Sequence, residues 1–173
     1  EVSFTHQQCN FGYRNSIFKT THKGKYVITR VTFKLTKNNH KIQTQYGAIN
    51  EHLSMNNSTS PTIKQVSDAV IAIRQSKLPD PKKLGNSGSF FKNPVLDSKT
   101  FEAFHTKFPE APFYALANSE FKIPAGWLIE QAGFKGKRYG DAGIHKNQAL
   151  VLVNYGNATG AQIWELALKI QQK

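Results

Sequence analysis

The chain has 173 residues, and 23 Lys and Arg against 11 Asp and Glu give a formal net charge of +12. Hydrophobic residues make up 39% and charged residues 20%, which is typical of a folded protein and excludes a disordered polycation. No apolar run reaches the ~18 residues of a membrane-spanning helix. The single cysteine, Cys9, excludes an internal disulfide framework. We therefore expect one domain, or one domain and part of another, in a reducing compartment and without a secretory signal.

The positive charge by itself leaves the ligand open. Nucleic acid, acidic lipid and a phosphorylated metabolite are all anions that a charge of +12 attracts. The basic residues are densest at 19–25, 34–41 and 135–146, but no run reaches about five consecutive like charges, which favours an ordinary solvated surface. A basic nucleic-acid-binding module remains an alternative.

The first third of the chain predicts strands followed by a loop. Residues 25–35 alternate, with Val27, Val31 and Phe33 among the apolar residues of one face, which predicts a strand. A turn signal at 37–40 and residues 41–46 predict a returning strand. The polar stretch 51–61 predicts a loop or a boundary between modules.

The remainder of the chain predicts mainly helices. Capping-box spacing at Thr62 and Thr159 starts two of them, and Pro79 stops the first. The expected helices lie at residues 62–77, 98–108, 124–132 and 159–170, and the continuous apolar run at 149–153 predicts a buried strand. The fold class is therefore α+β: an antiparallel strand segment, then an α+β domain with about four helices.

Few groups of residues in the sequence match a known metal-binding or ligand-binding motif. The six histidines are too scattered for a metal motif, so we expect no metal site. The segment 85–94 combines glycines, hydroxyls and aromatics, and it fits either an ordinary tight turn before a strand or a close backbone approach to a ligand. The segment 11–16 fits an exposed glycine turn or, through its aromatic–arginine pair, RNA contact, although it does not match the RNA-recognition pattern.

Five segments together resemble one family, the UDP-N-acetylenolpyruvoylglucosamine reductases (MurB). They are residues 9–19 (CNFGYRNSIFK), 77–82 (KLPDPK), 85–94 (GNSGSFFKNP), 125–135 (AGWLIEQAGFK) and 145–154 (HKNQALVLVN). The resemblance runs nearly end to end, and residues 45–47 (QYG) resemble the tyrosine loop of the family's type I branch. It implies a cytoplasmic, monomeric bacterial flavoenzyme of peptidoglycan synthesis that binds neither nucleic acid nor membrane.

The resemblance also implies a reaction and its residues. NADPH reduces bound FAD, and hydride then passes to UDP-N-acetylglucosamine-enolpyruvate, which gives UDP-N-acetylmuramate. Arg14 matches the arginine that faces the substrate carboxylate, and Ser89 matches the serine that protonates the neighbouring carbon. Matches to positions around the UDP-sugar are Tyr13, Tyr46, Lys77, Asn93, Tyr114, Lys135 and Gln148. A guanidinium suits a carboxylate because it forms two parallel hydrogen bonds, and serine needs only a good position to protonate an enolate.

The resemblance further implies a division of the chain. Residues 1–58 match the end of the FAD-binding lobe, a strand pair and the tyrosine loop, and residues 59–173 match the substrate-binding domain. The main part of the FAD-binding lobe and a catalytic glutamate near the family's C-terminus have no match here, and Glu165 lies in a helical stripe that does not replace it. A start at Glu1, with Met55 as the only methionine, fits a fragment. We expect this chain alone to bind the UDP-sugar weakly or not at all and to be inactive.

Overall fold

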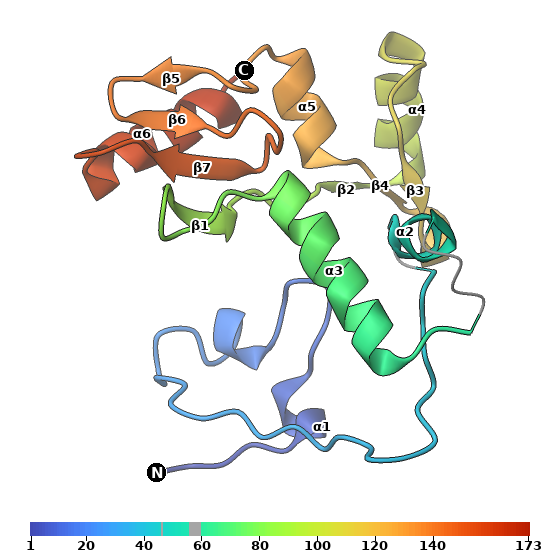
Figure 1. The fold of residues 1–173 in the computed structure, drawn as a ribbon. Coiled ribbons are helices and arrows are strands. Elements are labelled where there is room, and N and C mark those ends of the chain that lie inside the picture. The colour runs from blue at the N-terminus through green and yellow to red at the C-terminus, as the bar shows by residue number, and fades with distance from the viewer. Residues whose placement is uncertain (46, 56–59) are drawn as a thin grey trace. The chain divides into compact units, whose positions relative to one another are not determined.

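The structure, a computed structural model, describes residues 1–45, 47–55 and 60–173 (Figure 1). The chain forms two compact units, unit 1 at Glu1–Lys41 and unit 2 at Ile42–Lys173. The predicted class is confirmed, because the described residues combine helices with antiparallel sheets. The expected boundary at 58/59 falls at the edge of residues 56–59, which lie outside the described residues, and stays a prediction.

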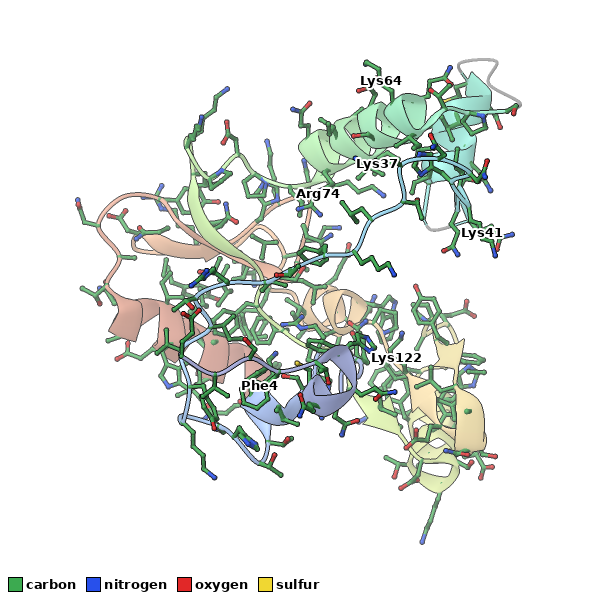
Figure 2. All side chains as sticks on the ribbon, turned by 90° about the horizontal axis from the view of Figure 1, so that it is seen from below. Phe4, Lys37, Lys41, Lys64, Arg74 and Lys122 are labelled. Atoms are coloured by element: carbon green, nitrogen blue, oxygen red, sulfur yellow. The ribbon has the colours of Figure 1, made fainter. Side chains whose placement is uncertain are left out.

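Unit 1 is held together by a cluster of aromatic rings. Its regular elements are α1 (His6–Cys9) and the 3₁₀ helix η1 (Ile17–Lys19). The ring of Phe4, labelled in Figure 2, lies 5.3 Å from that of Phe18 and 5.2 Å from that of Tyr26 in edge-to-face contacts. The ring of His22 stacks on Tyr26 at 5.5 Å. Such ring pairs add to the stability gained from burial alone.

The predicted strand at residues 25–35 is wrong for this structure. The segment has no regular secondary structure, and Val27 and Leu35 are 88% and 81% exposed. A strand needs a hydrogen-bonded neighbour, and an isolated pair of strands is marginal in water. Residues 41–45 form no returning strand either, and Tyr46, the last residue of that prediction, lies outside the described residues.

Unit 2 begins with two packed helices. In α2 (Ile49–Met55), Ile49 and Leu53 are buried against Ala69 of α3 (Ile63–Lys77). The predicted loop is therefore wrong at residues 51–55, because Leu53 and Ile49, four positions before it, share one buried helix face. The start of α3 is as predicted: the Thr62 hydroxyl accepts from the Gln65 backbone N–H, and the Gln65 side chain accepts in return from the Thr62 backbone N–H.

A four-stranded antiparallel sheet forms the main core. Its order is β1-β7-β6-β5, and the strands are β1 (Gly85–Ser89), β5 (Arg138–Tyr139), β6 (Ala142–Ile144) and β7 (Val151–Asn154). The helix α6 (Gly160–Gln171) lies along β6 and β7 in Figure 1, with Leu166, Ala167 and Ile170 buried in the same cluster as Ile144. The predicted buried strand is confirmed as β7, which is flanked by strands on both edges.

A second, three-stranded sheet joins the remaining helices. Its order is β2-β4-β3, with β2 (Val95–Leu96), β3 (Tyr114–Ala115) and β4 (Phe121–Lys122), and the 3₁₀ helix η2 (Ala117–Ser119) connects β3 to β4. The predicted helices appear as α4 (Ser98–Lys107) and α5 (Ala125–Gln131). Among the described residues, no helix is long and apolar enough to cross a bilayer.

Candidate functional site

A bulge in β1 brings Ser89 to the surface. Asn86 of β1 faces Val153 of β7, and Ser89 faces Val151, so β1 carries one more residue than β7 between these two pairs. Gly88 lies inside the bulge with φ +71°, a conformation that glycine adopts without strain. The Ser89 residue is exposed. The glycine-rich segment 85–94 therefore contains a bulged strand, and it ends in a surface hydroxyl.

Two of the predicted site residues, Asn93 and Gln148, lie beside the start of α5. The Phe90 N–H, directly after Ser89, donates to the Leu150 carbonyl at 2.8 Å. The Asn93 Oδ1 accepts from the Ala125 N–H, the first of α5, at 2.9 Å. A Cβ on Gly126 would lie 3.6 Å from Leu150 Cγ and 3.8 Å from Gln148 Oε1.

The β6–β7 loop therefore lies beside the start of α5, at a distance that a Cβ at position 126 would fill with ordinary van der Waals contacts. These contacts link the backbone after Ser89 and the side chains of Asn93 and Gln148 to the same junction. The hydroxyl and amide groups of these residues are of the types that bind sugar hydroxyls and phosphate oxygens.

Tyr114 lies in the three-stranded sheet beside a lysine that the sequence reasoning missed. Tyr114 and Lys122 face each other across β3 and β4, and the Lys122 Nζ lies 5.2 Å from the centre of the Tyr114 ring. Tyr114 is 57% exposed. An ammonium group over an exposed ring is attracted to its negative face and can also face an anion. The turn at Asn118 and Ser119, both of which have positive φ, was not predicted from the sequence. This turn makes β3 and β4 neighbours.

The two remaining predicted lysines have separate environments. Lys77 is exposed and is the last residue of α3, directly before the Leu78-Pro79 stop. The Lys135 Nζ pairs with Glu130 Oε1 at 2.8 Å, with its side chain 35% exposed. Lys135 is therefore held near the end of α5 by an acidic neighbour, and an anionic ligand would compete with that carboxylate.

Unit 1 holds the predicted catalytic arginine in a tight turn. The Gly12 and Asn15 backbones exchange N–H···O bonds of 3.0 and 3.1 Å around Tyr13 and Arg14. Arg14 has φ +51°, which is uncommon for a residue with a side chain. Its carbonyl accepts from Lys19 Nζ at 3.2 Å. Such a conformation costs about 1–3 kcal/mol and is concentrated at functional sites. Tyr13 is exposed, and Tyr46 lies outside the described residues.

His145 opens the β6–β7 loop that carries Gln148. Its backbone N–H donates to the Val151 carbonyl at 2.9 Å, and its carbonyl accepts from the Gln148 N–H at 3.3 Å. The ring Nδ1 is enclosed, and no partner is found for it in the described part of the chain. Burial, and then the charge of Lys146, lower the pKa of His145. The ring is therefore neutral at physiological pH, and the loop carries no histidine charge.

An apolar groove of about 830 Å³ lies beside this junction in unit 2. It is lined by residues that directly follow Ser89, such as Phe90 and Phe91, and by Trp127 of α5 and Trp164 of α6. Among the described residues, no group of three or more His, Cys, Asp or Glu side chains could hold a metal ion. The fold is that of an α+β domain, and the candidate site residues offer hydroxyl, amide and ammonium groups, which are types that suit a polar, anionic ligand.

The comparisons name the family. Residues 80–173 match the model of the UDP-N-acetylenolpyruvoylglucosamine reductase C-terminal domain. Proteins called UDP-N-acetylenolpyruvoylglucosamine reductase match from Flavobacterium johnsoniae (65% identity over 98% of this chain and 50% of that protein) and Amoebophilus asiaticus (49% identity, 97% and 49%). The chain belongs to the UDP-N-acetylenolpyruvoylglucosamine reductase family, and it spans about half the length of these curated relatives.

A solved structure is also similar. The crystal structure of UDP-N-acetylenolpyruvylglucosamine reductase (MurB) from Thermus caldophilus matches with 26% sequence identity and a TM-score of 0.40, over 64% of this chain and 30% of that chain.

Proposed function

We propose that this chain forms the substrate-binding part of a flavin-dependent reductase that converts UDP-N-acetylglucosamine-enolpyruvate to UDP-N-acetylmuramate in cytoplasmic peptidoglycan synthesis. One observation carries the proposal: in a member of this family a bulged strand exposes Ser89, and the side chains of Asn93 and Gln148 lie beside the first residues of α5. We do not propose the nucleic-acid alternative, because the family match and the relatives' names both favour the reductase.

The proposed roles follow from side-chain chemistry. Arg14 binds the substrate carboxylate through two parallel hydrogen bonds, which stabilise the negative charge that develops beside it. Ser89 donates the proton to the carbon next to that carboxylate. Asn93 and Gln148 bind the sugar and phosphate oxygens, together with Tyr13, Tyr46, Lys77 and Lys135. Tyr114 and Lys122 bind as one unit, since the ammonium group already lies over the ring.

We propose that FAD is bound mainly by a part of the longer protein outside this chain. The segment 85–89 is a strand paired with β7, so it is not a loop that could cradle the dinucleotide's phosphates. When bound, FAD reduced by NADPH supplies the hydride. We also propose that residues 1–58 are the end of the FAD-binding lobe, that residues 59–173 are the substrate-binding domain, and that the chain alone is inactive. We further propose that the full-length enzyme is a monomer.

The proton-donor role is tested with Ser89→Ala in the full-length enzyme. Turnover should fall by about 10²–10⁴-fold, because the proton donor is lost, while reduction of the flavin by NADPH stays unchanged. Ser87→Ala is the matched control, because Ser87 is also exposed on β1 but precedes the bulge glycine. Wild-type turnover by Ser89→Ala would remove Ser89 from the proposed role.

The carboxylate-binding role is tested with Arg14→Lys in the same enzyme. Turnover should fall strongly, because an ammonium group cannot reproduce the planar two-point contact of a guanidinium. Steady-state kinetics measure kcat and KM. Unchanged values of both would contradict the assignment.

A further inference from the structure

The side chain of Asn86 connects the bulge in β1 to the loop that precedes it. The Asn86 Oδ1 accepts from the Gly88 N–H at 3.0 Å, inside the bulge. The Asn86 Nδ2 donates to the Leu84 carbonyl at 2.9 Å and to the Pro79 carbonyl at 3.4 Å. The group is partly buried, so each of these bonds is shielded from water. One amide therefore links the end of the α3–β1 connection to the bulge.

This bulge decides which way Ser89 faces. Side chains alternate along a strand, so adding or removing one residue turns the following side chain to the opposite face. In an unbulged ladder, Gly88 would face Val151 and Ser89 would take the next position. The bulge depends on backbone conformation and not on crowding, because a Cβ on Gly88 would meet no atom within 4 Å while its φ is +71°. The Asn86 acceptor stabilises this conformation through the Gly88 N–H.

We propose that Asn86 is a positioning residue: its carboxamide fixes the β1 bulge and thereby holds the Ser89 hydroxyl in the orientation that protonates the substrate. The inference rests on the proposed function, since it assigns Asn86 a role through Ser89. Asn86 does not itself touch the substrate in this account. A displacement of about 1 Å at a reacting group can lower a rate about 100-fold, so the loss of one positioning amide has a measurable kinetic effect.

Asn154 provides a matched control on the neighbouring strand. Its Oδ1 accepts from the Gly156 and Ala158 N–H groups, both at 3.0 Å, and its Nδ2 donates to the Ala158 carbonyl at 2.8 Å. It is partly buried like Asn86, and it faces Gly85 at the opposite end of the β1–β7 ladder from Ser89. Replacing it removes an equivalent set of bonds without releasing the bulge.

The experiment compares Asn86→Ala, Gly88→Ala and Asn154→Ala in the full-length, flavin-loaded enzyme. We expect Asn86→Ala and Gly88→Ala to lower kcat by about 10–100-fold, with little change in KM and none in flavin reduction by NADPH. Amide hydrogen exchange at residues 88–90 should become faster in Asn86→Ala. Asn154→Ala should lower the melting temperature at least as much as Asn86→Ala and keep wild-type kcat. Wild-type kcat in Asn86→Ala, or an equal loss in Asn154→Ala, would overturn the inference.

A double-mutant cycle separates this inference from the function on which it rests. If Asn86 acts through Ser89, Asn86→Ala should cost little further turnover once Ser89 is alanine. If Asn86→Ala lowers turnover by its full factor even when Ser89 is alanine, the positioning role is overturned. Wild-type turnover in Ser89→Ala would refute the proton-donor role and this inference together. A slow Ser89→Ala beside an active Asn86→Ala would refute the inference alone.

Discussion

Two stretches that the sequence predicts to be strands have opposite outcomes in this molecule. Val151 and Val153 of β7 are 0% exposed, whereas Val27 and Leu35 of the segment 25–35 are 88% and 81% exposed. Strand preference reflects how well a side chain fits a half-buried pleated surface, and so it depends on neighbours. β7 has β1 on one edge and β6 on the other, while 25–35 has no strand partner among the described residues.

The difference shows that a strand-like sequence forms a strand only where a partner strand can pair with it. β7 receives its partners from residues before it in the same chain, and α6 lies against it. For the segment 25–35 we propose that the partner belongs to the flavin-binding part of the longer protein, since the relatives are about twice as long as this chain. The apolar face of that segment would then be buried only in the whole enzyme.

The largest expected contrast comes from truncating one apolar side chain in each region. Ile144→Ala, at a 0% exposed position in β6, should lower the free energy of unfolding by about 2–5 kcal/mol because it leaves a cavity in the core. Val27→Ala should change it by less than about 0.5 kcal/mol. Urea unfolding of this chain, followed by circular dichroism, measures both. Equal costs would show that Val27 is buried in solution.

A smaller effect is expected from adding a methyl group to the well-packed sheet. In Gly143→Ala, the new Cβ would lie 2.7 Å from Tyr155 Cε2 and 3.0 Å from the Lys137 carbonyl oxygen. Overpacking of this kind costs about 1–3 kcal/mol. Gly24→Ala in unit 1 is the control for added volume, because a Cβ there meets no atom within 4 Å, although its φ of +74° adds backbone strain. Unchanged unfolding of Gly143→Ala would contradict the close packing of this hairpin.

The next smaller effect, about 1 kcal/mol in the free energy of unfolding, is expected from removing one helix N-cap in each unit. Thr159 and Thr5 both form capping boxes, but α6 has three buried residues, Leu166, Ala167 and Ile170, and α1 has one, Cys9. Thr159→Ala should lower the free energy of unfolding by about 1 kcal/mol, and Thr5→Ala by less. Chemical denaturation of both variants gives the difference. A larger loss for Thr5→Ala would mean that unit 1 contributes more to stability than its packing indicates.

The smallest effect is a pH dependence at the start of α4. Hydrogen bonds from the Thr100 backbone and side chain lower the pKa of Asp97 below the usual aspartate value. Because the folded pKa lies below the unfolded one, this contribution is present above the unfolded pKa and is lost as the pH falls through the folded pKa. Asp97→Asn, which caps without titrating, should lose less melting temperature than the wild type between about pH 5 and pH 2. Parallel acid melting curves would contradict this account.

Local sequence signals predicted the longer elements well. The Thr62 and Thr159 capping boxes and the stop at Pro79 marked helices that the structure contains, because these interactions lie within a few residues. The short strands of β2-β4-β3 have two residues each, too few for any periodicity. The order of the four-stranded sheet depends on contacts between distant segments, which no local pattern contains.

The candidate site was predicted from motifs, and its geometry was not. Ser89 and Asn93 come from the segment 85–94 and Gln148 from the segment 145–154, and only the folded chain shows that Asn93 and Gln148 both lie beside the start of α5. Lys122 and the bulge-forming Asn86 were missed, because their roles depend on a cross-strand ring contact and on three hydrogen bonds to the backbone.

The most direct test of the central claim is amide hydrogen exchange of this chain and of the full-length protein, compared peptide by peptide. The claim is that residues 25–35 lack their partner here and gain it in the whole enzyme, whereas β7 has its partners in both. We predict slow exchange of β7 in both samples, and exchange of 25–35 that is fast in this chain and slow in the full-length protein. Fast exchange of residues 25–35 in both proteins would contradict the claim.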